Sequence, residues 1–363
     1  MKKMCQPTLY VYNLSDTFRD PRQKTLGVTA NTTAYYKHGH KLFDTGNYAL
    51  GEVFLARARQ YACRVHRAAD ADLFFIPAYS ARFFDSVSLG VDLFRELDAI
   101  TVGNTTALQK NGGNDHFMIQ PRIGASYERS PYKELNYRDT RLLCTHRLSL
   151  EQMTTHYGGT YNPEWFYESV PYPSHVRSPW RSSKRTRLVT IATSPHGRYR
   201  LLRKTLLHQC RARPTACAIG STDNVHDLYA SSTFCLQPPG DSVSRRGVID
   251  SLLVGCIPVF FHEEQLDQWP WHFRAWASNA SVLFGIPHSG QSINTNIIDE
   301  LSHVRHSDVF RMRESIEANS MKLMYSIKDT NESDAFVVTL RELWHRSKLG
   351  LHQHRTCERH VKR

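Results

Sequence analysis

The segment 234–261 constrains the fold of this chain more than any other part of it. It starts with an apolar run, 234–236, that ends at two prolines and a glycine. A polar turn follows, and apolar residues then recur at helical spacing up to Gly255. A second apolar run occupies 257–261. A strand, a glycine-containing turn, a helix and another strand make a βαβ unit, so we expect an α/β domain with a parallel sheet.

The turn of this unit places polar and basic side chains where the helix should begin, namely Ser242, Ser244, Arg245 and Arg246. Backbone N–H groups point outward at a helix N-terminus, and the helix dipole favours an anion there. Two adjacent guanidinium groups suit paired phosphate oxygens, so the turn is predicted to bind a diphosphate. Asp250 follows inside the helix, where it could accept from two ribose hydroxyls or form an ion pair with Arg246.

The rest of the chain repeats the alternation of short apolar runs and helical periodicity, which is typical of a doubly wound layout. A length of 363 residues is enough for two domains with separate cores, and the Pro-rich segment 170–179 is the best candidate for a linker. Strands are expected at 9–12, 73–76, 116–119 and 188–192, and helical segments at 46–64, 91–100, 201–207, 228–231 and 308–345.

The net charge of +12 would suit nucleic acid, an anionic membrane surface or acidic small molecules. No signature of a nucleic-acid-binding module accompanies it, so we expect no nucleic-acid partner. A run of about 18 apolar residues is absent, and the start of the chain has no apolar core. We therefore expect neither a membrane span nor a signal peptide in this sequence.

Eight cysteines and five Asn-X-Ser/Thr sequons favour an oxidising compartment. Cys210 and Cys217 bracket a short polar segment, where a local disulfide is expected. Cys235 and Cys256 lie within the apolar runs of the central segment and are interpreted as small buried hydrophobic side chains. A Cys-X-X-Cys pair is absent, which argues against a structural zinc site.

Several segments, in chain order, resemble the exostosin-like glycosyltransferases, and more narrowly the plant xyloglucan galactosyltransferase branch. The main one combines Pro-Pro-Gly-Asp-Ser at 238–242, Arg-Arg at 245–246 and Gly-Cys-Ile-Pro-Val-Phe-Phe at 255–261. The similarity covers roughly residues 8–345, and its other segments are 9–14, 71–79, 112–117, 169–173 and 271–273.

The resemblance implies a GT-B architecture, in which two doubly wound Rossmann-like domains face each other across a cleft. It also implies an inverting transfer of a sugar, galactose in this branch, from a UDP-sugar to a polysaccharide or glycan acceptor. We expect four parts, an N-terminal acceptor-side domain over 1–173, a C-terminal nucleotide-sugar-binding domain over 174–305, helices over 306–345 that could cross back to the first domain, and a basic tail over 346–363.

Two alternatives remain open at this point. The donor sugar could be xylose, arabinose, glucuronic acid, galacturonic acid or N-acetylglucosamine, or the chain could be a catalytically silent sugar-binding protein. No cofactor is expected besides the UDP-sugar co-substrate. Members of the family reside in the Golgi lumen behind an N-terminal membrane anchor, so the resemblance implies the Golgi lumen, although we expect no such anchor within this sequence.

Two arginines after the strand at 188–192 match arginines of the family, Arg198 and Arg203, and are expected to help bind the donor. Arg200 between them is more typical of a solvated helix face. The acceptor side is predicted to use His262, Trp271 and His272, because aromatic faces stack on sugar rings. Packing in a core is the competing interpretation for the tryptophans of this region.

A general base is needed to activate the acceptor hydroxyl, and it should come from the first domain. The candidates are Glu52, Asp115 and His116. His116 could instead position the donor sugar or satisfy a buried carbonyl, and Glu52 could be a solvated helix carboxylate. The sequence Asp70-Ala71-Asp72 has the D-X-D spacing of a metal site, but it directly precedes a predicted strand. We interpret it as a polar cap and expect no metal.

Overall fold

The structure is a computed structural model, and contacts divide the chain into two compact units. Unit 1 comprises 1–33, 48–170 and 325–363, and unit 2 comprises 34–47 and 171–324. The domain limits expected from the sequence stay a prediction. The described residues are 5–18, 34–37, 40–43, 49–78, 87–119, 145–151, 167–176, 184–240, 242–286, 293–326 and 333–350.

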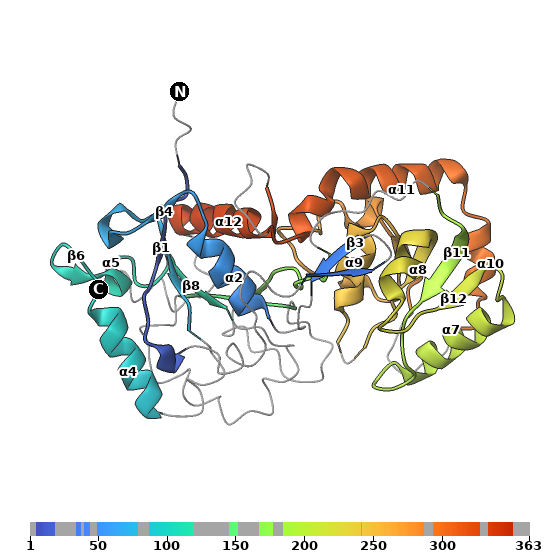
Figure 1. The fold of residues 1–363 in the computed structure, drawn as a ribbon, viewed down its shortest axis with the longest axis horizontal. Helices are drawn as coiled ribbons and strands as arrows, with labels where there is room; N and C mark the ends of the chain where they lie inside the picture. Colours follow the sequence, from blue (N-terminus) through green and yellow to red (C-terminus); the bar gives the residue numbers. More distant parts are fainter. Residues whose placement is uncertain are drawn as a thin grey trace. The chain divides into compact units, whose positions relative to one another are not determined.

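Unit 1 is built on a six-stranded sheet in which every pairing is parallel (Figure 1). The order is β10-β9-β8-β5-β1-β4. The central strands β5 and β8 are buried along their whole length, which is why the sequence reads there as short apolar runs. The strands are β1 (Leu9–Val11), β4 (Arg64–Val65), β5 (Leu73–Ile76), β8 (His116–Ile119), β9 (His146–Ser149) and β10 (Tyr167–Ser169).

The helices of unit 1 come from both ends of the chain. Helix α2 (Leu50–Arg59) contacts β1, and α12 (Ala335–Leu349) contacts β5. Helices α4 (Val87–Asp98) and α5 (Ala107–Lys110) contact each other beside a small hairpin of β6 (Thr101–Val102) and β7 (Thr105–Thr106). The C-terminal helix is therefore part of the core of the N-terminal unit.

A buried ion pair joins α2 to the start of α12. Arg57 Nε lies 3.1 Å from Asp334 Oδ2, and the two side chains are 1% and 0% exposed. The Arg57 guanidinium also lies 5.0 Å from the ring centroid of Phe336, which packs on Phe54 at 4.7 Å. Asp334 in addition caps α12 by accepting from the backbone N–H of Val337. One carboxylate thus fixes both the position and the beginning of the last helix.

Unit 2 is built on a five-stranded parallel sheet in the order β12-β11-β13-β14-β15. Two parallel sheets with helices confirm the predicted fold class of two Rossmann-like α/β units. That the units face each other across a cleft stays a prediction. The elements are β11 (Arg187–Ile191), α7 (Arg200–Ala212), β12 (Cys217–Ile219), α8 (Val225–Ser231), β13 (Ser232–Leu236), α9 (Arg246–Leu253), β14 (Ile257–Phe260), β15 (Val282–Leu283), α10 (Ile297–Ser302) and α11 (His306–Asn319).

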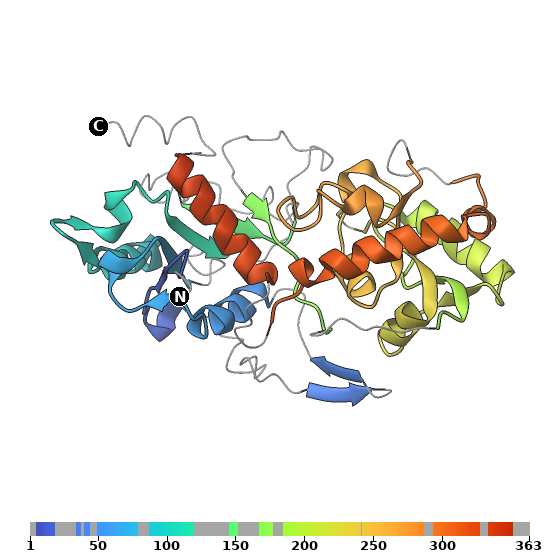
Figure 2. The same cartoon turned by 90° about the horizontal axis from the view of Figure 1, so that it is seen from above.

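The region expected to be helical over 308–345 contains two helices, with the non-helical residues 324–326 and 333–334 between them. Helix α11 ends at Asn319, a 3-10 turn η8 (Ser320–Leu323) follows, and α12 begins only at Ala335 (Figure 2). Helix α12 continues to Leu349, within the segment expected as a basic tail, and ends at a left-handed Gly350 with φ of 60°. No helix in the described ranges is long and apolar enough to cross a bilayer.

Three disulfides lie within the described ranges, Cys5–Cys63, Cys210–Cys217 and Cys235–Cys256. The first of these bonds lies in unit 1 and the other two lie in unit 2. The Cys210–Cys217 bond confirms the prediction. Cys235 and Cys256 are both buried, as interpreted, but they are bonded to each other rather than acting only as small hydrophobic side chains. Cys235 lies in β13 and Cys256 precedes the neighbouring parallel strand β14, which brings the two Cα atoms to 5.9 Å.

Candidate functional site

The strand order of unit 2 identifies the edge at which a ligand can bind. The chain passes from β11 to β12 on one side and then crosses back to β13 on the other, so β11 and β13 flank a topological switch point. Open α/β sheets bind ligands at the carboxyl ends of the strands beside such a point. The loop 192–199 follows β11 there, and the turn that leads from β13 into α9 lies beside it.

Arg245 connects the two loops at the switch point. It is the N-cap residue of α9, with extended backbone, and its side chain turns back toward β11. Its Nη2 donates to the carbonyl of Ala192 at 2.7 Å, and its Nη1 donates to Pro238 O at 3.4 Å. A guanidinium has five N–H donors, so these contacts leave donors that an anion at the start of α9 can use.

Arg203 makes a second connection between the same loops. It projects from α7, is 6% exposed, and its Nε donates to Pro239 O at 2.9 Å. Its Nη1 donates to Ser194 O at 3.1 Å and to His196 O at 3.3 Å. A Cβ on Gly240 would lie 2.7 Å from Arg203 Nη2, so a larger residue at 240 would displace the end of this side chain. The contacts described here give Arg203 a role in shaping the loops.

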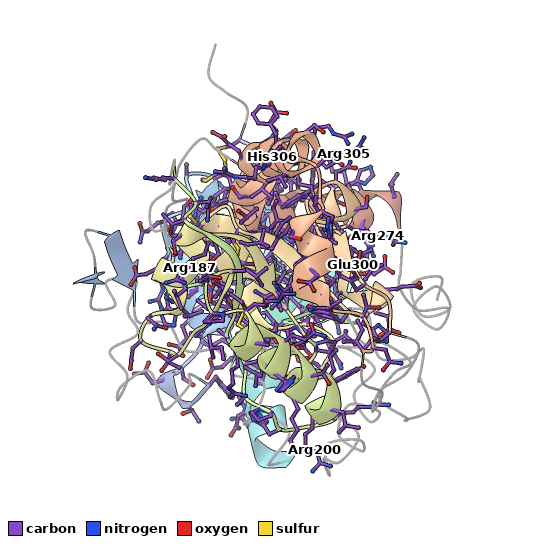
Figure 3. All side chains as sticks on the ribbon, turned by 90° about the vertical axis from the view of Figure 1, so that its right-hand side faces the viewer. Arg187, Arg200, Arg274, Glu300, Arg305 and His306 are labelled. Atoms are coloured by element: carbon purple, nitrogen blue, oxygen red, sulfur yellow. A yellow bond between two sulfur atoms is a disulfide. The ribbon has the colours of Figure 1, made fainter. Side chains whose placement is uncertain are left out.

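The remaining arginines of this region differ in exposure. Arg198 is exposed in the loop after β11, and Arg246 is partly buried in the first turn of α9. Arg200 is exposed at the start of α7 and extends away from the helix in Figure 3. This position agrees with its interpretation as a solvated residue.

Ser242 and Ser244 are both buried and fold the turn before α9. Ser242 Oγ donates to Ser244 O at 3.0 Å, and Ser242 O accepts from the backbone N–H of Gly240 at 2.8 Å. Arg245, at the N-cap position, makes no side-chain cap hydrogen bond to α9. The turn therefore brings the guanidinium of Arg245 to the N-terminus of α9, and anion binding there stays a prediction.

Asp250 is 4% exposed in α9 and is surrounded by donors from three segments of unit 2. Ser174 Oγ donates to Oδ1, while Arg246 Nε lies 3.5 Å and His226 Nε2 lies 3.7 Å from Oδ2. Burial opposes the charge of Asp250, but His226, Arg246 and Ser174 together hold its pKa below the ordinary value. The ion pair with Arg246 is present, and a role toward ribose stays a prediction.

Replacing Asp250 by asparagine tests this charge, and we expect a loss of about 1–3 kcal/mol in unfolding free energy at pH 7. A carboxylate whose folded pKa is lowered stabilises the protein above the ordinary pKa of about 4 and loses that effect as the pH falls through the folded value. The difference between wild type and Asp250→Asn should therefore be constant from pH 7 to 5 and shrink below pH 4. Urea unfolding at several pH values measures it. A difference that grows on acidification would contradict the lowered pKa.

Two of the base candidates lie in a buried hydrogen-bond chain of unit 1. His116 is 0% exposed, its Nδ1 lies 2.6 Å from Asp115 Oδ1, and its Nε2 lies 2.8 Å from the hydroxyl of Tyr12. The imidazole also stacks on Phe74 at 4.5 Å, and Asn111 donates to the other oxygen of Asp115. Burial and the charge of Asp115 raise the pKa of Tyr12, which keeps its hydroxyl protonated. This arrangement favours an internal network over a base that meets an acceptor.

The third base candidate, Glu52, lies half-buried in the first turn of α2, where a carboxylate complements the helix dipole. All three base candidates belong to unit 1, whereas the arginines and Asp250 belong to unit 2. Neither unit alone therefore contains both the base candidates and the residues proposed to bind the donor. The assignment of the base stays a prediction.

The acceptor candidates follow β14 in unit 2. The ring of His262 caps η6 (Glu263–Gln265) through its Nδ1, which accepts from the backbone N–H of Glu264. His272 is buried, and its carbonyl accepts from Trp276 Nε1 at 2.7 Å. Trp271 is half-buried. Core packing is observed for the neighbouring Trp269 and Trp276, which both contact Phe273.

The D-X-D sequence serves a structural role. Asp72 Oδ2 accepts from the backbone N–H of Thr8 at 2.8 Å and from its hydroxyl at 3.0 Å, which ties β5 to the residue before β1. Asp70 pairs with Arg67 at 3.3 Å on the surface. Within the part of the chain that the structure describes, no group of three or more His, Cys, Asp or Glu side chains could hold a metal ion.

Sequence reasoning missed two residues of this site, Ser174 and His226. Ser174 directly follows the segment 169–173, which carries part of the resemblance, so its place in the chain was a usable signal. No sequence signal pointed to His226, because it lies in a short helix with no motif around it. Only the packing of α8 against α9 brings it to Asp250.

Comparison with known proteins gives a consistent set of relatives. A family model described as the exostosin GT47 domain matches residues 5–282. A probable xyloglucan galactosyltransferase, GT15, of Arabidopsis thaliana is 24% identical over 335 residues, which cover 82% of this chain and 67% of that protein. The xyloglucan galactosyltransferase MUR3 of the same plant is 26% identical over 82% of this chain and 52% of its own length. A xyloglucan-specific galacturonosyltransferase is 28% identical over 64% of this chain and 39% of its own.

Solved structures give weaker similarity. The GtfA/B complex matches with a TM-score of 0.42 and 8% identity over 87% of this chain and 65% of that one. The Arabidopsis thaliana protein UGT89C1, solved with UDP, matches with a TM-score of 0.36 and 9% identity over 76% of this chain and 72% of that one.

Proposed function

Because this chain belongs to the exostosin GT47 family of glycosyltransferases, we propose that it transfers galactose from UDP-galactose to a xyloglucan-like polysaccharide or another glycan. The proposal includes inversion at the anomeric carbon and independence of a metal ion. The acceptor rests on the names of the plant relatives, of which this chain spans between 39% and 67% in the alignments described above.

One observation carries the donor site in this proposal. At the switch point of unit 2, Arg245 and Arg203 donate to backbone carbonyls of two neighbouring loops, and Arg245 is the N-cap residue of α9. When the bond to the anomeric carbon breaks, the leaving diphosphate gains negative charge. Fixed guanidinium groups and a helix N-terminus can stabilise that charge without a metal ion.

The remaining roles follow from the chemistry of the transfer. Asp250 is the proposed ligand of the ribose hydroxyls, since an ionised carboxylate only accepts hydrogen bonds. The acceptor hydroxyl gives its proton to a base, for which Glu52, Asp115 and His116 remain the candidates. The three disulfides suit an oxidising compartment, which fits the Golgi lumen of the family.

Galacturonic acid is the second candidate for the transferred sugar. It is favoured by the similarity to a galacturonosyltransferase, which has the highest identity of the three relatives described above. The basic charge of the chain would also suit a sugar with a carboxylate.

A panel of UDP-sugars tests the proposal, with and without xyloglucan, by the release of UDP. We expect acceptor-dependent turnover with UDP-galactose, a β-linked product by NMR, and activity that survives EDTA. Turnover with UDP-galacturonic acid alone would select the second candidate. Binding of UDP-sugars without turnover on any acceptor would favour a silent sugar-binding protein. Activity lost in EDTA and restored by manganese would refute metal independence.

A further inference from the structure

His226 is a buried histidine of unit 2. None of the roles given under the proposed function involves it. It lies in the first turn of α8, which begins after the carboxyl end of β12. The residue is 7% exposed, and its Nε2 makes no hydrogen bond to any described residue. The ring of His175 packs edge-on against it at 5.4 Å. The oxygen facing Nε2 is Asp250 Oδ2, at 3.7 Å.

The two oxygens of Asp250 differ in what they contact. Oδ1 accepts the hydroxyl hydrogen of Ser174, which itself accepts from the backbone N–H of Val176 at 2.9 Å. Oδ2 faces Arg246 Nε at 3.5 Å and His226 Nε2 at 3.7 Å. Both distances exceed those of an N–H···O hydrogen bond, about 2.7–3.2 Å. Oδ2 therefore keeps room for another donor, although two nitrogens lie within 3.7 Å of it.

We propose that His226 is a positioning residue of the donor site, whose Nε2–H orients Oδ2 of Asp250 toward a ribose hydroxyl of the nucleotide. The proposal rests on the donor role of unit 2. If Arg246 were the only donor near Oδ2, the carboxylate could turn fully toward the guanidinium. Oδ2 would then no longer be able to accept a hydrogen bond from the nucleotide. A second donor at 3.7 Å, His226 Nε2, opposes that turn. His226 then contributes to the selection of ribonucleotides over nucleotides that lack the ribose hydroxyls.

The experiment compares the binding of UDP and of 2′,3′-dideoxyuridine diphosphate by calorimetry. Wild type should prefer UDP by about tenfold or more, the effect of a hydrogen bond to a charged group. His226→Leu should lose most of this preference through weaker UDP binding, with binding of the dideoxy compound unchanged. His226→Gln should restore it, because the amide N–H of glutamine reaches the position of Nε2. His208→Leu, on the exposed face of α7, is the matched control and should behave as wild type.

A merely structural role for His226 predicts other results. It would weaken both nucleotides equally in His226→Leu, and this outcome overturns the inference. Thermal unfolding reports whether that variant folds. If it does not, the comparison of His226→Gln with His226→Asn decides, since the shorter amide should not reach Oδ2 and should lose the preference.

A double-variant cycle separates action through Asp250 from direct contact with the nucleotide. If His226 acts through the carboxylate, His226→Leu should weaken UDP binding little once Asp250→Asn is present. Additive losses would overturn the positioning role. Wild type that binds no UDP would refute the proposed function together with this inference, whereas UDP binding with the ribose preference intact in His226→Leu would refute the inference alone.

Discussion

Replacing Arg245 by alanine is expected to lower kcat by about 10²–10³-fold, the usual effect of removing one fixed donor from developing negative charge. The guanidinium lies at the N-terminus of α9 and is held in place by the carbonyl of Ala192 on the neighbouring loop. Its loss would remove the proposed donor to the diphosphate and also one hydrogen bond between the two loops. UDP release with a saturating acceptor, together with the Kd for UDP, measures both effects.

Two further variants sharpen the result for Arg245. Arg245→Lys keeps the charge but loses the planar set of donors, so activity should recover only in part. Arg200→Ala removes an equally charged but exposed side chain from the same unit and should leave kcat and the Kd near wild type. Near-normal turnover by a folded Arg245→Ala protein would remove this guanidinium from the donor site.

The largest loss of stability is expected from Arg57→Ala, at about 3–5 kcal/mol. The substitution leaves the carboxylate of Asp334 buried, with its ion-pair partner gone, beneath the start of α12. It also removes the guanidinium that lies over Phe336. Denaturant unfolding of the transition that belongs to unit 1 is the measurement, because two units need not unfold together.

Arg95→Ala is the matched control for this prediction. Arg95 pairs with Asp92 at 2.9 Å, but the two side chains are 74% and 47% exposed. Exposed pairs contribute about 0–1 kcal/mol. Equal losses in the two variants would show that the Arg57 pair is no stronger than a surface contact. Asp334→Ala should cost at least as much as Arg57→Ala, since it also removes the cap of α12.

The parts of the fold that the sequence predicted well are those with one dominant physical signal. The strands expected at 73–76 and 116–119 have those bounds in the structure, because buried parallel strands are apolar on both faces. Two short strands, β4 and β15, have two residues each and lie at the ends of their sheets, so they carry no such signal. The ends of the two helices α11 and α12 were not located within the region expected to be helical, because apolar residues recur at helical spacing in both.

The candidate site was predictable to a similar degree. The turn with Arg245 and Arg246 has a local signature, and the structure places it at the switch point of unit 2. That Arg203 binds loop carbonyls depends on the packing of α7, which no spacing along the chain encodes. The contact between His226 and Asp250 has the same origin. Contacts between residues that are distant in sequence decide which polar side chains form hydrogen bonds or ion pairs within the protein, and a spacing pattern does not show them.

The bond between Cys235 and Cys256 has a practical consequence for producing this protein. It closes a covalent ring that contains the turn and helix α9. The two ends of the proposed donor segment are thereby linked to each other at adjacent strands. A reducing expression host would yield chains in which that ring is open. Secreted or periplasmic material, assayed without thiol reagents, is therefore the right preparation, and weak binding by protein from a reducing cytosol would not count against the donor site.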